Sequence, residues 1–519
     1  MRRALFIFAI TFLLVLLVYR RAPMNFFRAE SGWYLSNSHA DAETQRKFKA
    51  DFFSRSYAGH YTPFAFLAEF GTAKAFGTNG TLWRLRQLVA VAAIGALLFA
   101  ATYSIGAAVG LARIQNGAIA AAVTAVSIYQ PLMIDFVGWP FMILQLAWIA
   151  LLLLTLWALT KAALGNRKRR FAWIAAMSAY ASMHFSGLGV VTVAATTVCL
   201  ATVSLSLPRG AAESRDIRLA LITMLCLAGI HGALMIYLLP PELVAAGASR
   251  PLGASVKLAL GFVANFTFAG IGSFVATASG PPNARSIAYS WPYGALLLAG
   301  AVAAPVWLFR RWSADTSPQN LLRFVLVAFS AVSFVMLMVL FWARYFRFGI
   351  TMEALASQVA FCTSVPRYVI PLHFIFVPIV ILVATQVARF APRPTFGLCV
   401  GVVVAAIAAQ MEFQKSTHRY VAPLGQLSHS SAWRLILQTV QECRAAGLPV
   451  PNVPLGTLTQ EFHDIDPRMF EPLLRRDLRL AFDEKIPLIP WEEYLAAPDR
   501  YRAVPSLSLL EAKLRIKRE

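Results

Sequence analysis

The fold is decided by the stretch FMILQLAWIALLLLTLWALTKAALGNRKRR, residues 141–170. Its first part carries no charged side chain over about 20 residues, the length that an α-helix needs to cross the hydrocarbon core of a bilayer. Its last part is the most basic short loop of the chain, and such loops stay on the cytoplasmic side of membranes. The stretch therefore predicts a transmembrane helix over residues 141–160 that ends in the cytoplasm.

The overall composition is that of a membrane protein. Of the 519 residues, 58% are hydrophobic and only 14% are charged, whereas about a quarter of the residues are charged in soluble domains. The net charge of +22 could indicate nucleic-acid binding, but many of the basic residues lie in short loops beside apolar runs, where they set topology. No nucleic-acid motif accompanies them. We therefore expect an all-α polytopic membrane protein that contacts membrane lipids and no nucleic acid.

Further apolar runs predict about eleven transmembrane helices in total. The first is MRRALFIFAITFLLVLLVYRR, which lacks the small-residue cleavage site of a signal peptide and is therefore expected to be retained. The other full crossings are expected near residues 87–110, 117–134, 141–160, 219–239, 293–309, 322–343, 367–388 and 395–411, with two short spans and an outer hairpin within 171–207.

Charges orient this bundle and divide the chain into domains. The basic start MRR places the N-terminus in the cytoplasm, so residues 20–86 form a large first periplasmic loop. Residues 255–278 would break the charge rule if they crossed the membrane, which favours a re-entrant or interfacial segment. Residues 412–519 are less hydrophobic and predict a small C-terminal soluble module in the periplasm, after a transmembrane domain over residues 1–411.

Polar residues that suit chemistry gather on the predicted periplasmic side. An ionisable group at membrane depth is costly unless it faces water, a partner or a substrate, which directs attention to acids at the ends of spans. The candidates are Glu30 in FFRAESGWYL, His60 and Tyr61 in AGHYTPFAFL, Asp135 in YQPLMIDFVGWPF, His184 in SMHFSG, and Arg367 and Tyr368 in SVPRYVIPLHF. No Cys/His cluster of zinc spacing, no P-loop and no G-x-S-x-G element is present.

In this order the segments resemble the GT-C superfamily of polytopic glycosyltransferases, particularly the protein O-mannosyltransferases and their bacterial relatives that use a polyprenyl-phosphate sugar. In that family a large first outer loop opens with an acidic motif and closes with a G-H-x-x-P-like segment, here AGHYTP. YQPLMIDFVGWPF is similar to the family's hP-x-x-x-E-x-x-x-W segment, with Asp135 and Trp139 at the Glu and Trp positions. PRYVIP is similar to its late RY-x-x-P element. The resemblance covers most of residues 1–390 and none of the C-terminal module.

The resemblance implies an inverting transferase of the bacterial inner membrane whose active site faces the periplasm. It would move a sugar from a polyprenyl-phosphate donor to a hydroxyl of a lipid, glycan or protein acceptor. Glu30 would be the general base that takes the acceptor's proton, and Asp135 would position the acceptor or a divalent cation. Arg367 would bind the lipid phosphate through its planar fork of donors. Further substrate-binding residues would be His60, Tyr61, His184 and Tyr368.

Other interpretations fit the residues as well. Relatives often have two adjacent acids in the first loop, whereas Ser31 follows Glu30 here, and Glu30 could be a solvated loop acid. Asp135 could instead cap a helix, Arg367 could anchor a span at the interface, and His184 stands where relatives often have a Lys or Glu. At the level of function, a transporter or flippase of lipid-linked sugars and an O-antigen-ligase-like transferase are the alternatives.

Overall fold

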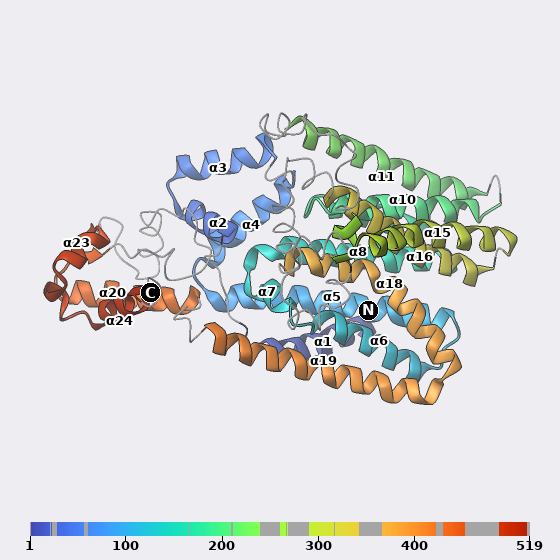
Figure 1. Cartoon of the computed structure of the whole chain (residues 1–519). Helices are drawn as coiled ribbons and strands as arrows, with labels where there is room; N and C mark the ends of the chain where they lie inside the picture. The colour runs from blue at the N-terminus through green and yellow to red at the C-terminus, as the bar shows by residue number, and fades with distance from the viewer. Residues whose placement is uncertain are drawn as a thin grey trace.

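The computed structural model describes residues 2–20, 22, 29–56, 61–165, 167–208, 211–238, 260–265, 267, 290–315, 317–341, 366–421, 429–451 and 487–515. Of this part of the chain, 86% is helical, which confirms the all-α prediction (Figure 1). The helices of the bundle are α1 (Arg2–Tyr19), α5 (Gly80–Ala108), α6 (Arg113–Ile128), α8 (Ile143–Leu164), α9 (Lys168–Ser182), α10 (Gly189–Leu205), α11 (Ala212–Tyr237), α15 (Trp291–Ala314), α16 (Pro318–Phe341), α18 (Pro366–Phe390) and α19 (Pro392–Val421).

A helix stands at every position where the sequence predicts a full crossing. Within the described residues, seven stretches are long and apolar enough to cross a membrane; they lie in α5, in α8 with its preceding turn, and in α11, α15, α16, α18 and α19. The apolar part of α1 and the whole of α10 are shorter, and α6 and α9 have 16 and 15 residues. The chain is therefore a multi-pass membrane protein.

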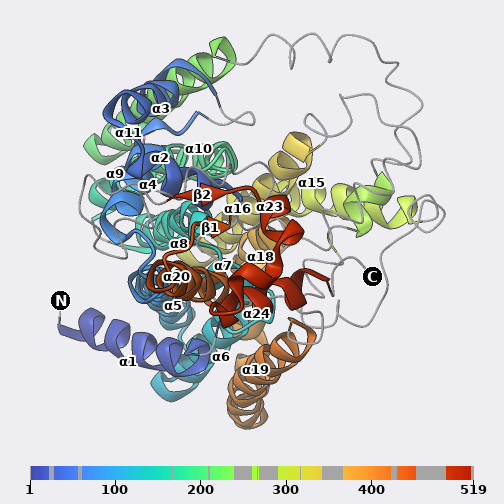
Figure 2. The same ribbon diagram turned by 90° about the vertical axis from the view of Figure 1, so that its left-hand side faces the viewer.

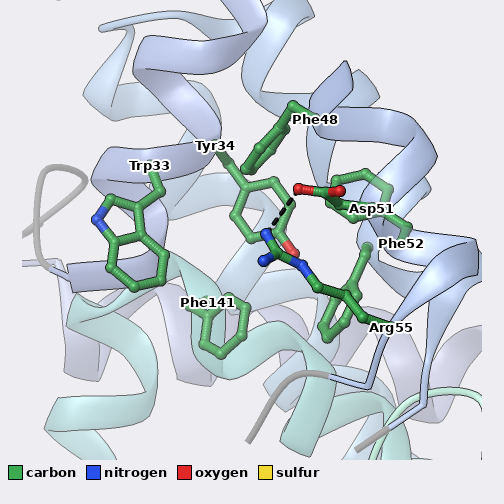
Figure 3. A pocket seen from close by; sticks show the side chains of 8 residues that line it. Trp33, Tyr34, Phe48, Asp51, Phe52, Arg55 and Phe141 are labelled. Carbon is green, nitrogen blue, oxygen red and sulfur yellow. Dashed lines mark hydrogen bonds and ion pairs between the residues drawn. The ribbon is translucent and has the colours of Figure 1, made fainter. Parts of the chain in front are cut away.

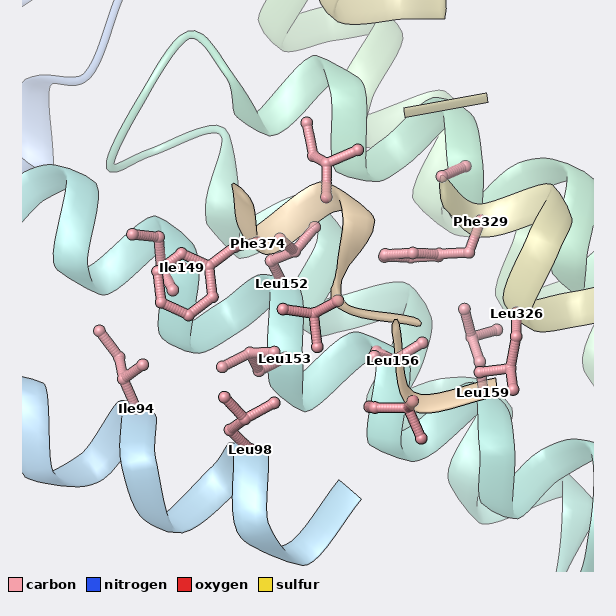
Figure 4. Packing of buried hydrophobic residues seen from close by; sticks show 14 of the residues in the cluster. Ile94, Leu98, Ile149, Leu152, Leu153, Leu156, Leu159, Leu326, Phe329 and Phe374 are labelled. Carbon is pink, nitrogen blue, oxygen red and sulfur yellow. The ribbon is translucent and has the colours of Figure 1, made fainter. Parts of the chain in front are cut away.

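The core of the bundle is built around α8, which packs against α5, α9, α10 and α16. Leu152 and Leu156 of α8 are buried between Leu98 of α5 and Phe329 of α16 (Figure 4). In contrast, α11, α15 and α19 leave most of their apolar side chains on the outside of the bundle. Because lipid tails are as apolar as leucine, close packing holds such a bundle together, and its outer surface suits a bilayer.

The connections between helices divide between two ends of the bundle, which we call the first-loop end and the opposite end (Figure 1). The first-loop end carries α2 (Ala29–His39), α3 (Ala42–Ser54), α4 (Pro63–Phe76), α7 (Met133–Gly138) and the turn between α9 and α10. There the Tyr19 hydroxyl donates to the Ile128 carbonyl at 2.5 Å, and the Gln414 amide donates to the Val18 carbonyl at 2.9 Å. These two bonds join the ends of α1, α6 and α19.

The first loop, expected over residues 20–86, is mostly helical and is shorter than predicted. Asn79 caps α5 by accepting from two backbone N–H groups, so α5 begins at Gly80 and includes the last part of the expected loop. The expected span over residues 117–134 also ends early, at Ile128, because Pro131 has no N–H with which to continue the helix.

The end of α11 and the beginning of α15 indicate whether the segment 255–278 between them crosses the membrane. The segment itself lies outside the described residues except for 260–265 and 267. α11 ends at the first-loop end, where the Ser56 N–H donates to the Leu238 carbonyl at 3.0 Å. The Cys199 thiol contacts the Val325 carbonyl at 3.6 Å, so α16 begins at the opposite end and α15, which precedes it, begins at the first-loop end. The end of α11 and the beginning of α15 therefore lie on the same side of the bundle.

The C-terminal module lies at the first-loop end as well (Figure 2). Its elements are α20 (His429–Ala445), the parallel strands β1 (Val450–Pro451) and β2 (Leu488–Ile489), α23 (Trp491–Ala496), the 3₁₀ helix η4 (Pro498–Tyr501) and α24 (Pro505–Arg515). The Glu442 carboxylate of α20 accepts from the Ser506 N–H of α24 at 3.0 Å. One hydrophobic cluster contains Val440 and Leu507 of this module together with Phe66 and Trp83 of the first-loop end.

Candidate functional site

The start of α2 is bonded to the segment that follows Asp135. Glu30 lies in the first turn of α2, although its side chain is outside the described residues. The next residue, Ser31, is buried, and its hydroxyl accepts a hydrogen bond of 3.0 Å from the Phe141 N–H. An acidic residue is favoured in the first turn of a helix because the helix dipole is positive there. The backbone of Glu30, the predicted base, therefore lies beside the segment of residues 133–142 that contains Asp135, which we call the Asp135 segment.

Asp135 lies in the short helix α7, and its side chain is half-buried. α7 is anchored from the membrane bundle, because the Gln87 amide of α5 donates to the carbonyls of Phe136 at 2.8 Å and Trp139 at 3.2 Å. The capping interpretation of Asp135 is wrong: the N-cap positions of α7 and of the 3₁₀ helix η1 (Pro140–Met142) are Leu132 and Trp139, neither of which caps through its side chain. Asp135 instead lies inside the first turn of α7.

A buried ion pair that the sequence did not indicate fixes the same segment. Arg86 of α5 and Glu69 of α4 form a two-bond ion pair, with the Arg86 Nη1 atom 2.5 Å from the Glu69 Oε2 atom. Arg86 also donates to the Pro140 carbonyl at 2.8 Å and lies over the Trp83 ring, with 4.6 Å from guanidinium carbon to ring centroid. Burial raises the pKa of the Glu69 carboxyl, and the Arg86 guanidinium opposes that rise.

Two of the predicted substrate-binding residues, Tyr61 and His184, belong to one ring cluster. His231 of α11 lies between them, with ring centroids 5.7 Å from Tyr61 and 4.8 Å from His184. Phe64 of α4 and Tyr180 of α9 contact the other edges of the His184 ring at 5.6 and 5.0 Å. Burial lowers the pKa of His184, so its imidazole favours the neutral form. His231 was not selected from the sequence because it stands alone in an apolar run.

The remaining candidates are placed by their backbone alone or not at all. Arg367 and Tyr368 lie in the first turn of α18, with side chains outside the described residues, and His60 lies wholly outside them. α18 packs against α7. One turn further on, the His373 Nε2 atom lies 3.0 Å from the Ser127 hydroxyl near the end of α6. The helix turn that carries Arg367 is therefore at the first-loop end, beside the helix that carries Asp135.

An aromatic pocket opens on the first loop next to these segments (Figure 3). It is lined by Trp33, Tyr34, Phe48, Asp51, Phe52, Arg55, Phe66 and Phe141, which come from α2, α3, α4 and η1. Tyr34 and Phe141 are stacked with ring centroids 6.0 Å apart. The Arg55 Nη2 atom donates to the Asp51 carboxylate at 2.6 Å, and both side chains are well exposed to solvent. We call these eight residues the aromatic pocket.

Apart from His60, which lies outside the described residues, the predicted site positions lie at the first-loop end, in two groups. One group joins the start of α2, α7 and the start of α18, and the other is the ring cluster around His184 and His231. Within the described residues, no group of three or more His, Cys, Asp or Glu side chains could hold a metal ion. The chain matches no family model, no curated protein and no solved structure.

Proposed function

We propose that the chain is an inverting glycosyltransferase of the bacterial inner membrane, which moves a sugar from a polyprenyl-phosphate donor to an acceptor hydroxyl on the periplasmic side. The proposal takes its chemistry from the GT-C-like order of motifs. One observation supports it above all: the Ser31–Phe141 hydrogen bond joins the acidic first-loop motif to the Asp135 segment, 110 residues away in the sequence. The packing of α18 on α7 adds the turn that carries Arg367.

The proposed topology has about eleven crossings, with the first loop and the C-terminal module in the periplasm. It is supported by the charges at the opposite end of the bundle, because basic residues mark cytoplasmic connections. The basic residues in or beside the connections at that end include Arg113, Lys161, Arg167, Lys168, Arg169, Arg170, Arg215, Arg218, Arg310, Arg311, Arg323, Arg389 and Arg393. In this topology residues 255–278 do not cross fully, since α11 ends and α15 begins on the same side.

The reaction assigned to the site conserves every atom and charge. The acceptor oxygen attacks the anomeric carbon, the bond from that carbon to the phosphate oxygen breaks, and the configuration inverts. The Glu30 carboxylate takes the acceptor proton, and polyprenyl phosphate leaves with the electron pair of the broken bond. A guanidinium such as that of Arg367 stabilises the charge on the departing phosphate. Phosphate is a good leaving group, so no second carboxylic acid is required to protonate it.

The test is transfer of a radiolabelled sugar from polyprenyl phosphate to endogenous acceptors in membranes that contain the full chain. Glu30→Gln should reduce the rate by at least about a hundredfold, because general-base catalysis contributes about 10²–10⁴. Glu43→Gln is the matched control: Glu43 is an exposed first-loop acid that pairs with Lys47, so this change should leave the rate unaltered. Full activity of Glu30→Gln would remove Glu30 from the base role. Movement of the labelled lipid across vesicles without any sugar transfer would support a flippase instead.

A further inference from the structure

The aromatic pocket combines flat apolar surfaces with one exposed pair of opposite charges. Tyr34 and Phe52 are at most 6% exposed, whereas Trp33 is 36% exposed (Figure 3). Phe66, which also lines the pocket, is 5% exposed. Ligand pockets are typically apolar and aromatic, with a few polar groups that orient the ligand. Asp51 and Arg55 are those polar groups here, in the last turn of α3 and at its C-cap.

We propose that this pocket binds an uncharged pyranose ring of a glycan. One face of such a ring carries C–H groups, which pack against the negative face of an aromatic ring. Its hydroxyls are both donors and acceptors, so they can pair at once with the carboxylate of Asp51 and the guanidinium of Arg55. The pocket supplies both kinds of surface side by side.

The same residues disfavour a phosphate or another anion. The Arg55 guanidinium is already bonded to the Asp51 carboxylate at 2.6 Å, so the pair carries no net charge and the carboxylate would repel an anion. Lys49, the nearest basic residue on α3 in sequence before Asp51, lies over the Phe70 ring at 5.6 Å, and Phe70 does not line the pocket. A neutral ligand with several hydroxyls therefore fits better than a lipid phosphate.

The pocket also stands next to the proposed reaction site, which gives the glycan a role. Phe141 lines the pocket with its ring and donates its backbone N–H to Ser31, the neighbour of Glu30. A glycan held in the pocket thus lies beside the first turn of α2. This assignment of the glycan as acceptor rests on the proposed transferase function, whereas binding of the ring itself does not.

The test is direct binding to the full chain in lipid nanodiscs. The probes are uncharged oligosaccharides built from glucose, galactose, mannose or N-acetylglucosamine, followed by saturation-transfer NMR and calorimetry. At least one probe should bind. Trp33→Ala and Asp51→Asn should each raise its Kd by about tenfold, as expected when one good contact is lost. Trp33→Phe keeps a flat ring and should retain most of the affinity. Glu43→Gln, which removes an equivalent pair on the same helix, should change nothing.

Two results would overturn the proposal. The first is that no probe binds at about 10 mM, a concentration that detects even very weak complexes. The second is that inorganic phosphate or a polyprenyl phosphate displaces the sugar, which would make the pocket an anion site.

Transfer assays distinguish a failure of the proposed transferase function from a failure of the proposed sugar-binding pocket. Glu30→Gln should abolish transfer and leave sugar binding intact, whereas Trp33→Ala should raise the KM for a glycan acceptor more than it lowers kcat. Sugar binding without any transferase activity would refute the proposed function alone. Transfer to a glycan acceptor with an unchanged KM in Trp33→Ala would refute the pocket alone.

Discussion

Arg86 and Glu69 show how one buried pair of residues ties the first loop to the bundle. The side chain of Glu69 is 2% exposed and that of Arg86 is 16% exposed, so both charges have lost most of their water. The cost of this desolvation is offset only while each group keeps its partner. Because Arg86 also holds the Pro140 carbonyl, the pair fixes the Asp135 segment relative to the first loop. The main effect of the ion pair is therefore to hold this segment in position.

The first prediction concerns the loss of one partner. Arg86→Met should destabilise the protein by about 3 kcal/mol at neutral pH, because it leaves a buried carboxylate unpaired. The double variant Glu69→Gln/Arg86→Met should recover much of that loss, since no charge is then buried. The measurement is thermal unfolding of the two variants and the parent chain in detergent. Equal destabilisation in the single and double variants would show that the charge of Glu69 is unimportant.

The same variant should also depend on pH in a defined direction. Burial raises the pKa of Glu69, and loss of Arg86 raises it further. An acid whose folded-state pKa lies above its unfolded value destabilises the fold increasingly as pH rises between the two values. Arg86→Met should therefore differ more from the parent at about pH 8 than at about pH 5. The double variant has no such acid and should show no such trend.

The sequence alone could nominate Asp135 but neither Glu69 nor His231. Asp135 stands out because an acid at the end of an apolar run is unusual, and its position can be read locally. Glu69 looks like any polar residue of a loop helix, and its partner Arg86 looks like a topology marker. They form an ion pair only because α4 and α5 are in contact, and no periodic pattern in the sequence indicates that contact. His231 likewise depends on contacts with two separate segments, those that carry Tyr61 and His184.

At the scale of elements, the turn between α9 and α10 depends on the small size of Gly189. A Cβ atom added there would lie 2.3 Å from the Met183 nitrogen and 2.4 Å from its Cα atom, and backbone atoms cannot rotate away. This turn holds His184 against Phe64 of the first loop. A change at Gly189 would therefore disturb both the helix pair and the ring cluster.

We predict that Gly189→Ala destabilises the protein by about 1–3 kcal/mol, the usual range for overpacking. Gly117→Ala is the matched control, because an added Cβ there meets nothing within 4 Å and alanine favours the helix. Unfolding midpoints in detergent should fall for Gly189→Ala and stay level or rise for Gly117→Ala. If the two midpoints moved together, the turn would not be as tight as the structure has it.

The positions of the helices were predictable because apolar length is a property of a continuous stretch. Each expected crossing has its helix, including the pair α9 and α10 that was expected from the polar interruption at residues 182–187. The ends were predicted less well, since α5 begins at Gly80, directly after its cap Asn79, and α6 stops before Pro131. Both signals are local and readable, whereas the three helices of the first loop have mixed charge and no long apolar run.

At the scale of the whole molecule, the two ends of the bundle differ in architecture and in how their basic residues are placed. The opposite end has short connections flanked by arginine and lysine, such as Arg169, which pairs with Asp216 at 3.3 Å. The first-loop end carries the first-loop helices and the C-terminal module, which share one hydrophobic cluster. The basic end should face the cytoplasm, because positive residues in short loops resist translocation. In that orientation, the substrates of the proposed transferase would reach its site from the periplasm or the outer leaflet.

This orientation gives the last prediction. In a chain whose native cysteines are replaced, single cysteines at the exposed positions Ala42, Ala497 and Ala314 report on the first loop, the C-terminal module and the turn between α15 and α16. A membrane-impermeant maleimide added to intact spheroplasts should label Ala42→Cys and Ala497→Cys but not Ala314→Cys, which should react only after the membrane is opened. Labelling of all three positions from outside would break the charge argument. Labelling of Ala314→Cys alone would show that the orientation is the reverse of the proposed one. The first-loop end would then face the cytoplasm, where a transferase that uses periplasmic lipid-linked sugars could not have its site.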